Sequence, residues 1–174
     1  METNTIESNA IDAAAVVITP QALLEHWQGH RSLSRKMIEA FPESEFYSFS
    51  IGGMRTYAGL TMEMLDLAGP GVRGIATGDW SGYGQSGDNT HTEAPTSKAE
   101  VLAAWDAMTN HINEYWPQIQ PPRFQEVEVA FGQYENANYA TLLYLIDNEI
   151  HHRGQGYVYL RALGIEPPAF WDRS

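Results

Sequence analysis

The sequence predicts an all-α protein, a four-helix bundle with a long glycine-rich loop between its second and third helices. Two observations support this prediction. Four segments repeat apolar residues at intervals of three and four, which is the period of an amphipathic helix. In addition, 43% of the 174 residues are hydrophobic, enough for one core without metals or disulfides as staples. Because each apolar stripe has only other helices to pack against, a bundle follows.

The first and second helices have clear signals at their ends. Residues 1–19 are expected to form a flexible tail before a single domain at 20–174. The pair Thr19-Pro20 is a typical helix start, and Pro42 ends the first apolar stripe. A linker follows, and a second stripe runs from Met54 to Leu67, where Gly69-Pro70-Gly71 should stop or kink the helix.

The remaining elements follow a loop expected at residues 69–95, which contains seven glycines and whose role the sequence leaves open. Ser97 and Glu100 form a capping box for a third helix that Pro117 closes. Residues 127–131 alternate as a short extended segment does. A long fourth helix is expected from a cap at Asn136 to Gly164.

Composition excludes several classes of function. The chain has no cysteine, so disulfides, thiolate metal sites and cysteine nucleophiles are ruled out. Its net charge of −12 opposes binding to nucleic acid and to anionic membranes, and no apolar run approaches the roughly 20 residues that span a bilayer. The apolar run at 13–18 follows acidic residues and no basic ones, unlike an export signal, so a cytoplasmic location is expected.

The most informative segment is DNEIHHRGQ, residues 147–155, inside the fourth helix. Residues four apart lie on one helix face, so Asn148 and His152 have the spacing of the zinc motif H-E-x-x-H with its first histidine replaced. His151 falls on the opposite side from His152, and the apolar neighbours of His152 indicate that it points inward.

Two stretches resemble a known family. The segment EIHHRGQGYVYLRALGIEPP strongly resembles the final helix of the DinB-like (DinB/YfiT) four-helix bundles, and MRTYAGLTMEML is similar to their second-helix signature. Family members typically bind nickel or zinc through three histidines. The matching positions here are Glu63, Asn148 and His152, so the resemblance implies a divalent metal held by a carboxylate, an amide oxygen and an imidazole. Zinc, manganese or magnesium suits such ligands.

The same residues allow a second interpretation. Glu63 stands close to the apolar face of its helix, where an unpaired carboxylate is costly and must find a partner. An ion pair with His152, with Asn148 hydrogen-bonded alongside, would keep this geometry without a metal. Glu149 is the candidate catalytic acid or base on a bound water, or else a salt-bridge partner of Arg153. His30 is expected either to reach the site or to be a hydrogen-bonded core residue.

Two functions therefore remain open at this stage. The first, implied by the resemblance, is a metal-dependent thiol S-transferase or hydrolase that acts on a small-molecule substrate with a small thiol cosubstrate. Glu63, Asn148 and His152 would hold zinc, nickel or manganese, and Glu149 would assist. The second is a non-catalytic bundle or small-molecule binder whose metal site has been lost. In both cases a homodimer is expected, and neither nucleic acid nor membrane is an expected partner.

Overall fold

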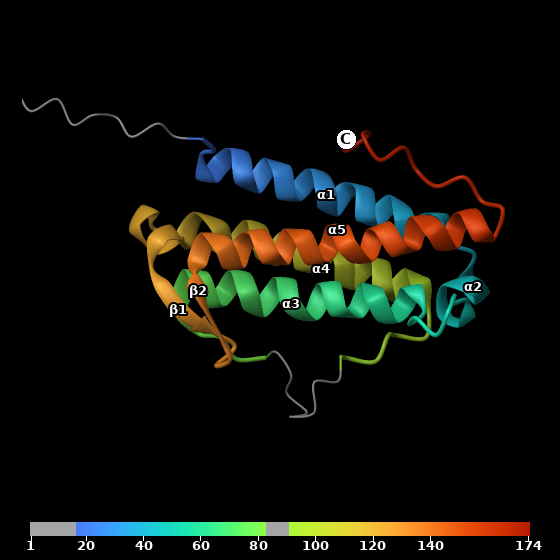
Figure 1. The fold of residues 1–174 in the computed structure, drawn as a ribbon, viewed down its shortest axis with the longest axis horizontal. Coiled ribbons are helices and arrows are strands. Elements are labelled where there is room, and N and C mark those ends of the chain that lie inside the picture. The colour runs from blue at the N-terminus through green and yellow to red at the C-terminus, as the bar shows by residue number, and fades with distance from the viewer. Residues whose placement is uncertain (1–16, 83–90) are drawn as a thin grey trace, which may run out of the picture.

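The computed structural model describes residues 17–82 and 91–174, and four long helices packed side by side dominate it (Figure 1). The predicted all-α fold is confirmed. Most of the tail expected at 1–19 lies outside the described residues. The elements, in chain order, are α1 (Pro20–Ala40), α2 (Glu43–Ser48), α3 (Tyr57–Thr77), α4 (Lys98–Tyr115), the 3-10 turns η1 (Trp116–Gln118) and η2 (Pro121–Gln125), β1 (Val127–Ala130), β2 (Tyr134–Ala137) and α5 (Asn138–Ala162).

Several helix ends form as their capping residues predict. The Thr19 hydroxyl oxygen accepts a hydrogen bond from the backbone N–H of Ala22 at 3.1 Å. Ser97 accepts one from the backbone N–H of Glu100 at 3.3 Å, and its hydroxyl donates to the Glu100 carboxylate at 2.7 Å. After α5 the chain reverses through Gly164 at φ 76°, a left-handed conformation that favours glycine. These local signals therefore set the helix boundaries.

Of the two outcomes expected at Gly69-Pro70-Gly71, a stop or a kink, the stop is wrong. Helix α3 continues through this tripeptide to Thr77, so the connection to α4 begins at Gly78 rather than at residue 69. The reason is tertiary. A Cβ on Gly71 would lie 2.6 Å from Leu145 Cδ1 of α5, so glycine permits a close helix approach here. That packing outweighs the hydrogen bond lost at Pro70.

Two other local predictions change in the structure. Part of the expected linker after Pro42 is a short helix, α2. Asn136 does not cap the last helix: it lies in β2, and Ala137 occupies the N-cap position of α5. The extended segment predicted at 127–131 is confirmed as β1, which pairs antiparallel with β2. The hairpin is fastened to the bundle because Arg123 donates to the Ile75 carbonyl at 3.0 Å and to the Glu128 carboxylate at 2.6 Å.

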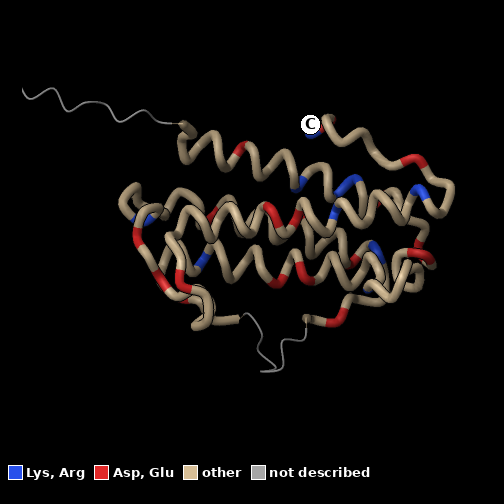
Figure 2. Tube along the Cα trace, viewed as in Figure 1, with Lys and Arg blue, Asp and Glu red and all other residues tan. Residues whose placement is uncertain are grey.

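The core runs the length of the bundle, and α5 packs against both α3 and α1. Trp27, Trp105 and Tyr159 are fully buried, as their positions on the apolar faces predict. Lysine and arginine residues are spread over several elements of the described chain (Figure 2). No helix in the described ranges is both long enough and apolar enough to cross a membrane.

Candidate functional site between α3 and α5

The carboxylate of Glu63 on α3 meets the imidazole of His152 on α5. Glu63 Oε1 lies 3.0 Å from His152 Nε2, and the two side chains are only 14% and 6% exposed. One turn earlier on α5, Asn148 donates its amide N–H to the same carboxylate oxygen at 3.3 Å. The structure thus brings together all three residues that the resemblance selects, in the paired arrangement that the second interpretation describes.

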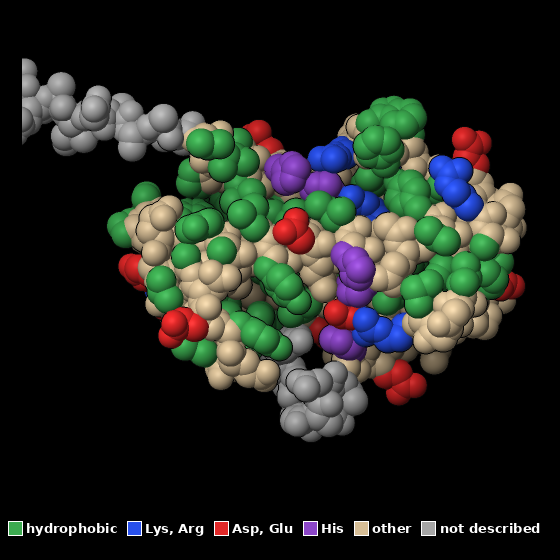
Figure 3. Space-filling view, viewed as in Figure 1, with side chains coloured by type: hydrophobic (Ala, Val, Ile, Leu, Met, Phe, Trp, Pro, Cys, Tyr) green, Lys and Arg blue, Asp and Glu red, His purple; other side chains and the backbone are tan. Residues whose placement is uncertain are grey.

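Two further residues complete the cluster, and sequence reasoning missed both. Arg55, just before α3, forms an ion pair with Glu63 Oε2. His91, from the segment before α4, places its Nε2 3.5 Å from the same oxygen and its Nδ1 3.6 Å from Asp66 Oδ2. No spacing rule links His91 to α3, because His91 belongs to neither α3 nor α4. On the surface, histidine, acidic and basic side chains gather in the middle of one face (Figure 3).

The charges of this cluster favour an ionised Glu63. Partial burial acts to raise the pKa of the Glu63 carboxyl, but the polar contacts with His152 and Arg55 outweigh burial and lower it to about 2. The site therefore presents a carboxylate anion at neutral pH. An anion that faces an imidazole and an amide is a suitable partner for a cation.

One buried polar atom in the cluster, Asn148 Oδ1, lacks a hydrogen bond within the described residues. His152 Nε2, in contrast, is held by the Glu63 carboxylate at 3.0 Å. On the other side of the ring, Gln155 Nε2 lies 3.5 Å from His152 Nδ1. Leaving a buried polar atom unsatisfied costs about 1–3 kcal/mol. The unsatisfied oxygen belongs to a residue selected as a metal ligand.

The donor set fits a divalent metal only when Asn148 is included. Among the described residues, no three histidine, aspartate or glutamate side chains are arranged to hold an ion together. Glu63 and His152 supply one oxygen and one nitrogen, and the Asn148 amide would have to turn its oxygen, rather than its nitrogen, toward them. Carboxylate, amide oxygen and imidazole are chemically suitable ligands for zinc, manganese or magnesium.

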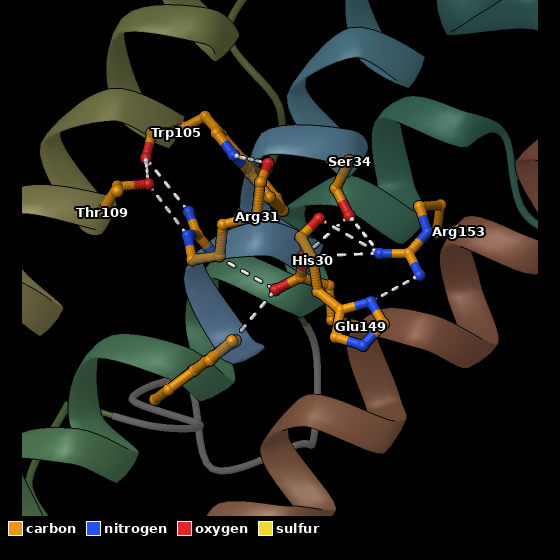
Figure 4. Close-up of polar contacts among 8 residues, drawn as sticks. His30, Arg31, Ser34, Trp105, Thr109, Glu149 and Arg153 are labelled. Atoms are coloured by element: carbon orange, nitrogen blue, oxygen red, sulfur yellow. Dashed lines mark hydrogen bonds and ion pairs between the residues drawn. The ribbon is translucent and has the colours of Figure 1, made fainter. Parts of the chain in front are cut away.

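Glu149 lies in a separate cluster on the side of α5 that faces α1. Its carboxylate, 2% exposed, accepts hydrogen bonds from the Ser34 hydroxyl at 2.7 Å and the Trp27 indole N–H at 3.3 Å. Arg31 lies 3.5 Å away and Arg153, the expected salt-bridge partner, 3.9 Å away (Figure 4). The structure therefore directs the carboxylate of Glu149 toward α1 and not toward Glu63.

His30 belongs to the cluster around Glu149. Arg153 Nη2 lies 2.8 Å from its Nδ1, and His26 Nε2 lies 3.2 Å from its Nε2. Burial, followed by the charges of Arg153, Arg173 and His26, lowers the pKa of the His30 imidazole to about 3. Of the two roles expected for His30, the structure favours the hydrogen-bonded core residue.

The fold and this geometry define a class: a helical bundle with a polar site between its long α3 and α5 helices. The chain belongs to the DinB family, whose sequence profile matches residues 8–173.

Two solved structures share the fold. A DinB-like protein from Bacillus subtilis aligns with a TM-score of 0.66 at 17% identity, over 85% of this chain and 96% of its own. A DinB-like protein from Bacillus cereus ATCC 10987 aligns with a TM-score of 0.65 at 18% identity, over 86% and 95%. No match was found among curated proteins.

Proposed function

We propose that this DinB-family bundle binds a divalent metal ion between α3 and α5, with Glu63, Asn148 and His152 as ligands, and acts there on a small molecule. The observation that supports the proposal is the convergence of the Glu63 carboxylate, the His152 imidazole and the Asn148 amide, whose buried Oδ1 has no hydrogen-bond partner among the described residues. Family membership supports it as well. An ion would satisfy that oxygen and balance the carboxylate charge.

Each ligand has a defined task in this proposal. Glu63 supplies the negative charge, and the contacts that keep its pKa low keep it available at neutral pH. His152 must present an unprotonated Nε2, which places the proton on Nδ1. Gln155 can accept a hydrogen bond from the protonated Nδ1 of His152 when the Gln155 amide is rotated so that its oxygen, rather than its nitrogen, faces the ring. Asn148 must make the equivalent amide rotation toward Glu63.

The reaction that fits best is metal-dependent thiol transfer or hydrolysis. When bound, the ion would lower the pKa of a coordinated thiol or water and so generate a nucleophile. Because the chain contains no cysteine, the thiol would belong to a small cosubstrate. Because residues of α1 already engage the Glu149 carboxylate, its part would be to hold α5 in position against α1 and not to act on the bound water.

One observation favours the second function, a non-catalytic bundle or binder without metal. The Arg55 guanidinium already pairs with Glu63, and it provides positive charge in the position where an ion would act. In that case the ion pair of Glu63 and His152 is structural. The metal is then lost because Glu63 and Asn148 stand where family members have two of their three histidine ligands.

Metal analysis separates these functions. Protein purified without chelator or polyhistidine tag is analysed for elements, and zinc, nickel and manganese are titrated by calorimetry. Glu63→Gln should abolish binding, whereas Asn148→His should tighten it by restoring an imidazole. Arg55→Gln should also tighten it by removing a competing cation. The matched control is Glu128→Gln, which removes a different carboxylate paired with arginine.

The outcomes are distinct. Stoichiometric metal in the parent that is lost in Glu63→Gln supports the metal site. Metal that appears only in Asn148→His supports the non-catalytic bundle. The ligand assignment is contradicted if Glu63→Gln retains the metal. It is also contradicted if the parent, Asn148→His and Arg55→Gln all bind no metal.

A further inference from the structure

A cavity of about 220 Å³ lies where the β1–β2 hairpin meets α3 and α5. Its walls are largely apolar and aromatic, and none of the described residues that line it is charged. The lining includes Leu67, Phe131, Tyr134, Asn136, Thr141 and Tyr144. The hairpin residue Phe131 adopts φ 56°, which is uncommon for an aromatic residue, and its ring packs edge-on against Trp80 at 5.4 Å. The wall of the cavity is therefore formed by a constrained turn.

The wall of the cavity also contains polar groups. Thr141 is only 6% exposed, and its hydroxyl is not among the fully buried polar atoms that lack a partner in the described part of the chain. Because Thr141 lines the cavity, its hydroxyl is available to a molecule inside it. The lining thus combines an apolar interior with a few polar groups, among them the Thr141 hydroxyl and the Asn136 amide.

The size and chemistry of the cavity restrict what it can hold. A dry cavity of about 150 Å³ lined by apolar side chains holds benzene. A cavity of about 220 Å³ therefore accommodates one ring with a short substituent. A charged ligand is disfavoured, since no lining residue would pair with it. The cavity suits an uncharged, single-ring molecule that carries a hydroxyl or carbonyl group.

The cavity lies next to the Glu63 cluster. On α3, Leu67 follows Glu63 by four residues, and on α5, Tyr144 precedes Asn148 by four. Residues four apart are neighbours on one helix face, separated by about 5–6 Å. Both helices therefore place the cavity one turn from the candidate metal ligands.

We infer that this cavity holds the ring of the substrate, an uncharged single-ring molecule whose polar arm extends one helical turn to Glu63 and His152. This inference rests on the proposed function, because it identifies the substrate class of that site.

Fluorine NMR with 4-fluorobenzyl alcohol tests the cavity. The wild-type protein should bind the probe saturably, and Tyr144→Ala should weaken binding at least about fivefold by removing one aromatic wall. Leu143→Ala is the matched control, because Leu143 is a neighbouring, 44% exposed apolar residue of α5 that does not line the cavity. Thr141→Val should weaken the alcohol but leave 4-fluorotoluene unchanged. The absence of saturable binding, or equal binding by Tyr144→Ala, would overturn the cavity assignment.

A paramagnetic ion tests the link to the site. Mn²⁺ bound at Glu63 should accelerate the fluorine relaxation of the bound probe, and Glu63→Gln should abolish this effect. Probe binding by a protein that binds none of zinc, nickel and manganese would refute the proposed function and leave the cavity as a ligand site. Mn²⁺ binding without probe binding would refute this inference alone. If the probe and Mn²⁺ both bind but the fluorine relaxation of the probe is not accelerated, the ring does not belong to a substrate of the metal site.

Discussion

Glu149 is a buried carboxylate that neutralises positive charge in the core. Arg31 and Arg153 are 1% and 6% exposed, and burial lowers the pKa of both guanidinium groups. Arg31 also lies over the Trp105 ring at 3.8 Å and donates to the Trp105 carbonyl at 3.0 Å, so it has no route to water. Glu149 is the anion in contact with both arginines.

We therefore expect Glu149→Gln to destabilise the protein by about 3–5 kcal/mol, because it leaves buried arginine charges without their counter-ion. Urea unfolding followed by circular dichroism measures the change. The surface variant Glu39→Gln breaks an exposed pair with Arg35 and should cost less than about 1 kcal/mol. If Glu149→Gln unfolded like the parent but lost a metal-dependent activity, the residue would be catalytic instead.

Because of His30, we expect the stability of the folded protein to depend on pH. Its pKa of about 3 in the folded protein lies below the ordinary histidine value of 6.5, so between these pH values the unfolded chain binds a proton that the folded protein does not bind. Stability should thus fall as the pH drops from 6.5 toward 3, by at most about 1.4 kcal/mol per pH unit from this residue. In His30→Asn, urea midpoints measured from pH 7 to pH 4 should decline less steeply than in the parent. Parallel slopes would contradict the assignment.

At the residue scale, the sequence identified part of the candidate site. Glu63, Asn148 and His152 could be selected because helical spacing and the family resemblance can be recognised in each helix separately. Arg55 and His91 could not. Their contacts with Glu63 depend on where the segment before α3 and the end of the α3–α4 connection cross the surface, and no local periodicity encodes that path.

At the scale of elements, helix packing depends on glycines whose contacts with other helices cannot be recognised from the sequence pattern. Gly156 of α5 faces Tyr57 at the start of α3, and a Cβ there would lie 2.3 Å from the Tyr57 ring. That ring is fully buried and stacked on Phe41 at 4.4 Å, so it has no space into which to move.

Two glycine substitutions on α5 should therefore have opposite effects. Gly156→Ala should destabilise the protein by about 2 kcal/mol or more through overpacking against Tyr57. Gly154→Ala, two residues away with no atom within 4 Å of the added Cβ, should stabilise it by about 0.5–1 kcal/mol through helix propensity. Thermal and urea unfolding of the pair measure both. A loss of stability in both variants would point to helix geometry rather than contact with Tyr57.

The same principle explains why α3 is longer than predicted. Glycine and proline at 69–71 usually interrupt a helix, and local propensity alone favours a loop there. In the folded protein, Gly69 and Gly71 face Met108 of α4 and Leu145 of α5, where larger side chains would collide. Small residues that terminate an isolated helix thus serve here as contact points between helices.

At the scale of the whole molecule, the net charge of −12 affects how readily two copies of the chain associate. The expected homodimer remains a prediction, as do the expected lack of nucleic-acid and membrane partners and the cytoplasmic location. Like charges on two copies repel, and salt screens that repulsion.

Sedimentation measurements should therefore show a species of twice the 19.5 kDa chain mass, whose fraction rises as salt increases from about 20 to 300 mM. Increasing protein concentration at constant salt should shift the same equilibrium. A monomer at all concentrations and salt levels would exclude the dimer, and a dimer that dissociates with salt would indicate an interface held by ion pairs.

The sequence by itself determined the fold class, the starts of α1 and α4 and the inward positions of Glu63 and His152, because apolar periodicity and capping are local properties of the chain. Only the tertiary structure decided how far α3 extends, that Glu149 faces α1 with Arg31 and Arg153, and that Arg55 and His91 join Glu63. These features depend on distances between elements far apart in the chain. Such distances follow from how side chains of several helices fill one core together.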